Sequence, residues 1–190
     1  TKESVNQQAP FLLVETEAEM EKFDLLIKNA DIYTMDAYGT VIKNGVIGIQ
    51  GDTISLISQM DTLDPCDAEK VIDAKGSVIF PGFINTHIHI FQSFLKGLGA
   101  DHRLIEWLNL SALPYGQYMT PEQHKLAAQL ACMEAIKSGC TSICEFFYTN
   151  QDPELAYSCI DGMKSTGIRS VFIRTFQDAG EEYGMPECFI

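Results

Sequence analysis

Short apolar and β-branched runs, separated by turn residues, make up the chain between residues 23 and 77. The runs cover residues 23–35, 40–50, 53–58 and 71–73. Pairs such as Tyr38-Gly39 and Gly51-Asp52 punctuate them. Runs of this length bounded by glycine-containing turns predict β-strands. We expect them to form a small β-sandwich leaflet, preceded by an acidic arm over residues 1–22.

From residue 78 onward the pattern changes to strand, loop and helix in alternation. Thr120-Pro121-Glu122 combines an N-cap residue, a proline at the first helical position and an early acid, and Gly139 follows as a stop. These signals predict a helix ending near Lys137. A strand over 141–148, a helix over 153–166 and a strand over 169–176 follow. Such alternation is typical of a parallel α/β sheet.

The composition and net charge of the chain limit the kinds of partner that it is expected to bind. The formal net charge is −13, with 46% hydrophobic and 21% charged residues. An acidic chain is a poor ligand for nucleic acid or an anionic membrane surface, and no apolar run reaches the roughly 18 residues that a spanning helix needs. The six cysteines form no C-x-x-C pair. We therefore expect free thiols and a cytoplasmic location, with no nucleic acid and no membrane as partner.

The strongest chemical signal is a histidine pair in the stretch 77–94, which reads SVIFPGFINTHIHIFQSF. His87 and His89 are two residues apart, so on a strand their side chains share one face. Two neighbouring imidazoles make half of a metal site. Spacing alone leaves open that the two are structural histidines on a half-buried strand.

The stretch 80–89, FPGFINTHIH, resembles the PGF-x-[ND]-x-H-x-H signature of the metal-dependent amidohydrolase superfamily. It is most similar to the branch that holds triazine hydrolases and the guanine and S-adenosylhomocysteine deaminases. The similarity continues through Lys96-Gly97, Glu106-Trp107-Leu108 and residues 134–142, and covers most of residues 23–175. The resemblance implies a (β/α)₈ barrel.

Such a barrel typically needs about 250 residues, and only three β/α units are present here. The expected fold class is therefore α/β: the N-terminal part of a (β/α)₈ barrel, preceded by the leaflet. We expect an arm at 1–22, a leaflet at 23–77 whose completing strands are missing, and a truncated barrel at 78–190. The chain is interpreted as a fragment of a longer protein.

The resemblance also implies the chemistry. His87 and His89 would hold one divalent metal ion, Zn²⁺ by preference or Fe²⁺, and the metal would turn water into a nucleophile at neutral pH. The other ligands and the acid/base residue belong to later strands, beyond Ile190. His102 and His124 are expected to be solvated surface residues.

Substrate contacts are expected from Gln92, whose amide could pair with a ring, and Trp107, which could wall a flat heterocycle. For both, a purely structural role stays open. Glu145 and Arg174 are interpreted as a structural ion pair. Nucleoside deaminases of the branch hold the ribose with a Glu at the position of Gly116, so the resemblance favours a free base or triazine-like ring.

Three interpretations of function remain. The first is a hydrolase of a non-peptide C–N bond on a purine-, pyrimidine- or triazine-like ring. A deaminase is the favoured form of this activity, and a dechlorinase is the less favoured form. The second is a ring-opening cyclic amidohydrolase of the hydantoinase or dihydroorotase kind, which commonly uses two metals. The third is a catalytically inactive binding module, should 190 residues be the natural length. Members of the branch are often homo-oligomers, so we expect an oligomer and favour a dimer.

Overall fold

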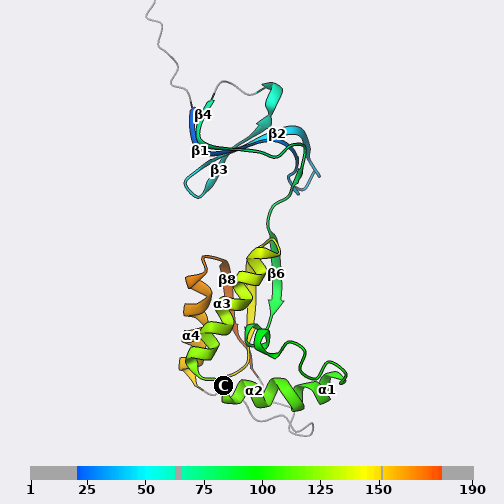
Figure 1. The fold of residues 1–190 in the computed structure, drawn as a ribbon, viewed down its shortest axis with the longest axis vertical. Helices are drawn as coiled ribbons and strands as arrows, with labels where there is room; N and C mark the ends of the chain where they lie inside the picture. The colour runs from blue at the N-terminus through cyan, green and yellow to red at the C-terminus, as the bar shows by residue number, and fades with distance from the viewer. Residues whose placement is uncertain (1–20, 63–65, 151, 177–190) are drawn as a thin grey trace, which may run out of the picture. The chain divides into compact units, whose positions relative to one another are not determined.

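A computed structural model of the chain describes residues 21–62, 66–150 and 152–176. Contacts divide the chain into two compact units, residues 1–81 and residues 82–190. Both units are drawn in Figure 1. Most of the expected 1–22 arm and the end of the chain from residue 177 lie outside the described residues.

The first unit contains one mixed five-stranded sheet. Its strands are β1 (Glu21–Tyr33), β2 (Val41–Gln50), β3 (Thr53–Gln59), β4 (Cys66–Asp73) and β5 (Val78–Ile79), with a 3-10 turn η1 (Met60–Thr62) after β3. The order is β3-β2-β1-β4, and β5 also pairs with β1. Strands β1, β2 and β3 are antiparallel neighbours, whereas β4 and β5 run parallel to β1.

Two details of this sheet correct the expectations from sequence. Glu21 and Lys22 begin β1 and so are not part of an arm. Val78 and Ile79 pair with Asp31 and Ile32 of β1, so they complete the first unit instead of starting the parallel sheet. The sandwich itself stays a prediction, because the described residues of this unit form a single sheet.

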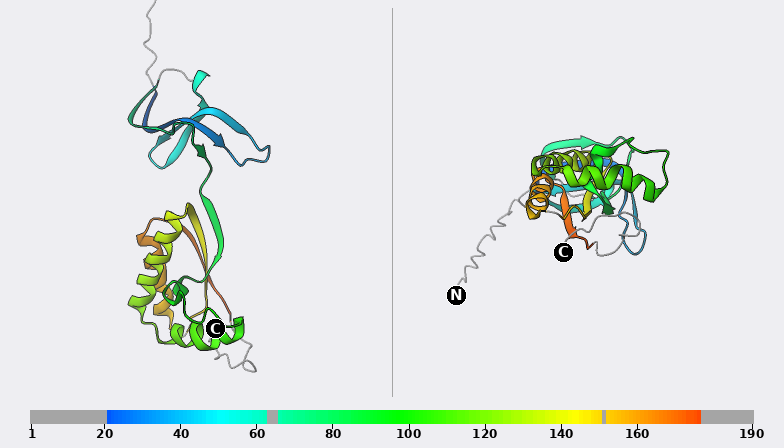
Figure 2. Two further views of the ribbon diagram at one scale, coloured as in Figure 1. Left: turned by 45° about the vertical axis from the view of Figure 1, so that its right-hand side comes forward. Right: turned by 90° about the horizontal axis from the view of Figure 1, so that it is seen from below.

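The second unit is a parallel sheet of three strands, β6 (Phe83–Ile88), β7 (Cys140–Phe147) and β8 (Arg169–Arg174), in that order. Helices α3 (Pro121–Lys137) and α4 (Pro153–Ser165) cover one face of it, as the two orientations in Figures 1 and 2 both show. Ile143 and Phe147 of β7 are buried against these helices, together with Cys132, Cys159 and Met163. Alternate residues of β7 therefore face the opposite side of the sheet.

The two helices form where the sequence predicts. Thr120 caps α3: its hydroxyl accepts from Gln123 N at 3.3 Å, and its own amide donates to Gln123 Oε1 at 2.8 Å. Asp152 caps α4 by accepting from Glu154 N at 2.8 Å. At the crossing of the helices, a Cβ added to Gly162 would lie 2.4 Å from a main-chain oxygen of α3. Glycine is therefore what allows this close approach.

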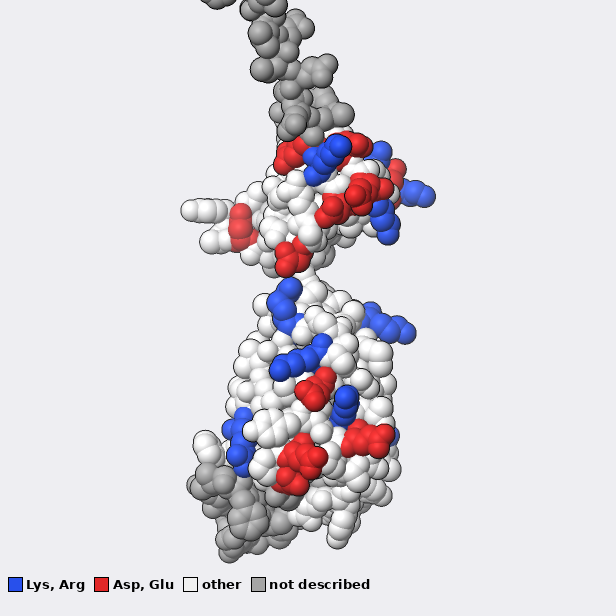
Figure 3. Space-filling model, turned by 90° about the vertical axis from the view of Figure 1, so that its left-hand side faces the viewer, with Lys and Arg blue, Asp and Glu red and all other residues white. Residues whose placement is uncertain are grey.

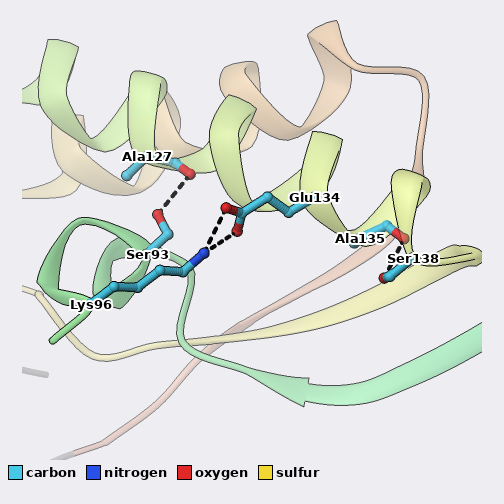
Figure 4. Close-up of polar contacts among 6 residues, drawn as sticks. All are labelled: Ser93, Lys96, Ala127, Glu134, Ala135 and Ser138. Atoms are coloured by element: carbon cyan, nitrogen blue, oxygen red, sulfur yellow. Dashed lines mark hydrogen bonds and ion pairs between the residues drawn. The ribbon is translucent and has the colours of Figure 1, made fainter. Parts of the chain in front are cut away.

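The long connection between β6 and α3 is largely helical. It contains the 3-10 helix η2 (Ile90–Leu95), α1 (Leu104–Trp107), the π-helix η3 (Leu108–Ala112) and α2 (Leu113–Tyr118). Figure 4 shows how η2 is tied to α3. Ser93 Oγ donates to Ala127 O at 3.2 Å, and Lys96 Nζ donates to Glu134 Oε1 at 2.6 Å. These contacts fix the segment that directly follows the histidine pair.

The charged surface, the helix lengths and the cysteines each bear on expectations from the sequence. On the face drawn in Figure 3, acidic and basic side chains are interspersed in each unit and form no broad basic area. Within the part of the chain that is described, no helix is long and apolar enough to cross a membrane. Five cysteines there, Cys66, Cys132, Cys140, Cys144 and Cys159, are free thiols.

Candidate metal centre

His87 and His89 stand side by side where β6 ends and η2 begins. Their Nε2 atoms are 3.3 Å apart, and their rings are nearly perpendicular, with centroids 4.8 Å apart. The side chain of Asn85 accepts from the His87 amide at 3.1 Å. The H-x-H spacing therefore aims both Nε2 atoms at the same point, as the strand periodicity predicts.

The distance between the two nitrogens fits ligation of one metal ion. Zn–N bonds of about 2.0–2.1 Å at a tetrahedral angle put two ligand nitrogens about 3.3–3.4 Å apart. His87 is exposed and His89 is half-buried, so one side of the pair is accessible. In the residues described here, no group of three or more His, Cys, Asp or Glu side chains could hold a metal. The pair could therefore supply two ligands, and a complete metal site would need more.

The tautomer of His89 is fixed by its neighbour on β7. Its Nδ1 lies 2.6 Å from the carbonyl oxygen of Phe146. A carbonyl only accepts, so Nδ1 carries the hydrogen and the lone pair is on Nε2. Burial lowers the pKa of His89, the Phe146 carbonyl partly opposes this, and His87 lowers it further. With the hydrogen on Nδ1, Nε2 is the nitrogen of His89 that could act as a ligand.

A pocket of about 450 Å³ opens beside His89. Gln92, Trp107 and Tyr148 line it, together with leucines of the α1–η3–α2 segment. Gln92 Nε2 donates to the hydroxyl of Tyr148 at 2.7 Å. Trp107 Nε1 donates to Leu98 O at 3.0 Å, which fixes the indole at the wall of the pocket. The pocket therefore combines a mostly apolar lining with a few polar atoms, as small-molecule sites do.

The structure brings together the four residues singled out from the sequence, since His89, Gln92 and Trp107 line one pocket and His87 contacts His89. Whether they bind metal and substrate remains a prediction. Tyr148 was missed as a site residue. The available signal was its place at the end of a strand, two residues beyond Phe146, where parallel sheets carry their sites.

Glu145 lies elsewhere than expected. It faces the helix layer, is fully buried, and accepts from Ile90 N at 2.7 Å through Oε2. Arg174 instead donates to Asn150 Oδ1 at 3.1 Å, so the expected ion pair is wrong. Burial raises the pKa of the Glu145 carboxyl to about 8, although the hydrogen bond from Ile90 lowers it. The strand alternation that turns Phe146 to one side turns Glu145 to the other.

His124 was expected at the surface and is fully buried instead. Its ring lies between Phe91 and Phe147, with centroid separations of 6.2 and 5.5 Å, and its Nε2 is 3.5 Å from Thr149 Oγ1. Burial lowers the pKa of His124 to about 4. The charged neighbours of His124 in the sequence suggested solvent, but its helix position faces the sheet.

Comparison with known proteins identifies related chains. A family model described as "Amidohydrolase family" matches residues 78–183. The 5-methylthioadenosine/S-adenosylhomocysteine deaminase of Bacillus cereus (strain AH187) is 33% identical over 147 residues, which are 76% of this chain and 34% of the relative. The chain thus spans about a third of the length of the curated relatives it matches.

Solved structures share the fold. Atrazine chlorohydrolase from Arthrobacter aurescens TC1, complexed with zinc, superposes with a TM-score of 0.71 at 18% identity, covering 87% of this chain and 39% of that one. An adenosine deaminase from Xanthomonas campestris with bound zinc gives 0.68 at 22% identity, covering 80% and 34%. At these identities the likeness is one of fold.

Proposed function

Because the chain belongs to the amidohydrolase family, we propose that the full-length protein hydrolyses a C–N bond on a nitrogen heterocycle with the help of one divalent metal ion. The observation that carries this proposal is the 3.3 Å separation of the His87 and His89 Nε2 atoms beside a pocket that His89 lines. Metal chemistry and heterocycle binding would then meet at one place.

His87 and His89 would hold the metal through Nε2, zinc being the first choice because imidazole suits it and two solved neighbours contain zinc. When bound, such a metal makes water nucleophilic at neutral pH. The chain's own contribution is orientation. The Phe146 carbonyl holds the His89 tautomer, and β6 keeps both imidazoles on one side.

The substrate would occupy the pocket beside His89. Trp107 offers a flat apolar wall, and Gln92, whose amide nitrogen donates to Tyr148, has an amide oxygen that could accept from the substrate. A ring amine could donate to that oxygen, and the leucines around it would exclude water. This arrangement suits a flat heterocycle with an exocyclic amino group.

The remaining machinery is assigned beyond residue 190. Fold neighbours of two to three times this length support a (β/α)₈ barrel, of which β6, β7 and β8 with their helices would be the first units. Further metal ligands and the acid/base residue would come from its later strands. A cytoplasmic homo-oligomer, most simply a dimer, completes the proposal.

Two substrate classes have support from different observations. Gly116 is buried, and a Cβ there would come within 2.9 Å of a Thr149 side-chain atom and 3.0 Å of one of Phe91. The carboxylate that the resemblance expects here for a ribose diol is absent, and a larger residue would have to displace these side chains, which favours a free base or triazine. The curated relative named above acts, by its name, on nucleosides, which favours a nucleoside deaminase.

One experiment tests the proposal. The full-length protein is analysed for metal content and assayed for ammonia release from an aminotriazine, a free aminopurine and adenosine. We expect one zinc per chain, activity that chelation removes, and loss of both in His87→Ala. Faster turnover of the free rings than of adenosine would select the first substrate class. Full activity of a metal-free protein would refute the proposal.

A further inference from the structure

Glu145 is an ionisable side chain placed where an apolar one would be expected. It is fully buried on the helix-facing side of β7, between Ile143 and Phe147, in the same layer as the core cluster. Its Oε1 has no hydrogen-bond partner among the described residues. Burying a carboxyl group is unfavourable unless a hydrogen bond compensates for the lost hydration. Such a placement calls for a specific role.

The bond that Glu145 makes is to the main chain directly after a proposed metal ligand. The amide of Ile90 donates to its Oε2 at 2.7 Å, and Ile90 is the residue that follows His89. Ile90 is also the first residue of η2, whose N-cap residue, His89, provides no side-chain cap. Amides in a first helical turn lack partners within the helix, so Glu145 supplies one from the neighbouring strand.

The next residue of β7 holds the other half of the same segment. The main-chain carbonyl of Phe146, the residue after Glu145, accepts from the His89 imidazole at 2.6 Å. Across the β6–β7 pair, Glu145 stands in register with Ile88. Two consecutive residues of one strand therefore fix the ring of His89 and the peptide that follows it.

We propose that Glu145 is a positioning residue for the metal centre. By binding the Ile90 amide it fixes the main chain at the turn from β6 into η2, and so sets the direction in which His89 Nε2 points at His87. The inference rests on the proposed function, because it needs the histidine pair to be ligands. Partners of this kind beyond the ligands change metal affinity by about 10- to 100-fold when removed.

The test compares zinc affinity in variants of the full-length protein, by competition with a chromophoric chelator. Glu145→Met removes the acceptor at similar length, and Glu145→Gln keeps an oxygen with the same reach. Ile143→Ala is the matched control, because Ile143 is buried on the same face of β7, two residues away, and has no part in the Ile90 bond. The visible spectrum of the cobalt-substituted proteins gives a second readout of ligand geometry.

We expect Glu145→Met to raise the Kd for zinc about 10-fold or more and to alter the cobalt spectrum. Glu145→Gln and Ile143→Ala should stay within about threefold of the unsubstituted protein, although Ile143→Ala loses stability. Equal affinity in Glu145→Met, or an equal loss in Ile143→Ala, would overturn the inference while leaving the proposed function in place. If the unsubstituted protein bound no zinc, the proposed function and the inference would both fall.

A measurement on the unsubstituted protein tests the inference even if a Glu145 variant does not fold. Hydrogen exchange reports directly on the Ile90 amide. We expect strong protection of this amide in the metal-free protein, because the Glu145 bond is independent of metal. Exchange at the rate of an unprotected amide would overturn the inference.

Discussion

Because His124 is buried, its titration should make the free energy of unfolding depend on pH, and substituting this one residue measures its share of that dependence. The ring is fully buried among Phe91, Phe147 and Thr149, and its Nδ1 has no partner among the described residues. The folded protein therefore disfavours the imidazolium, and the pKa of His124 falls to about 4. Histidine in an unfolded chain has a pKa of about 6.5.

The sign and size follow from proton linkage. Above about pH 7.5, one unit over the unfolded-state pKa, both states hold an almost entirely neutral imidazole, and His124 adds little to the pH dependence. As the pH falls, the unfolded state takes up a proton first, so the free energy of unfolding decreases. The loss is about 2 kcal/mol at pH 5 and about 3 kcal/mol once the pH is well below 4.

The assay is urea unfolding of the protein and of His124→Leu between pH 7.5 and 5, followed by far-ultraviolet circular dichroism. The difference between the two unfolding free energies cancels the titration of groups that both proteins share, including Glu145. We expect this difference to shift by about 2 kcal/mol in favour of the variant on going from pH 7.5 to 5. Leu126→Ala, an exposed position on the same helix, is the control, because it changes no ionisable group and should give a difference that does not vary with pH. A flat difference for His124→Leu would refute the burial of a neutral ring.

Three further outcomes are expected. Gly162→Ala should lower the free energy of unfolding by about 1–3 kcal/mol in urea titrations, since its Cβ would lie 2.4 Å from a main-chain oxygen of α3. The control Asp161→Ala, at an exposed position of the same helix, should not lower the free energy of unfolding in this way. A higher free energy of unfolding for Gly162→Ala would contradict the close packing of the two helices. Elemental analysis should find less zinc in His89→Ala than in the unsubstituted protein, and equal occupancy would show that His89 is no ligand. Tyr148→Phe should lower kcat/KM for a heterocyclic amine about 5- to 10-fold by removing the hydroxyl that orients Gln92, and an unchanged value would exclude that role.

The sequence could predict those features that depend on residues close together in the chain. The cap of α3 at Thr120 and Pro121 is local, and so is the stop at Gly139, whose φ is +90°. The shared face of His87 and His89 also follows from strand periodicity alone. These expectations agree with the structure.

What it could not predict depends on the partner of each strand and helix. The sequence predicts Val78 and Ile79 as the start of the parallel sheet of the second unit. In the structure they pair with β1, in parallel, within the first unit. His124 follows Glu122 and Gln123, so its surroundings in sequence are polar, yet its turn of α3 faces Phe91 and Phe147. Burial of this kind is set by packing between distant segments, which a local pattern does not contain.

Glu145, whose position the sequence did not predict, shows how the two kinds of information combine beside the histidine pair. Periodicity separates Glu145 from Phe146 to opposite faces of β7, and the parallel pairing with β6 brings both beside the turn after the histidine pair. One bond then acts on an imidazole and the other on a peptide amide. A metal ligand needs its ring direction as well as its place in the chain, and only the place is written in the H-x-H motif. Under the proposal the direction is set by β7, some 55 residues later in the chain, so the motif would become a metal site only when this sheet has formed.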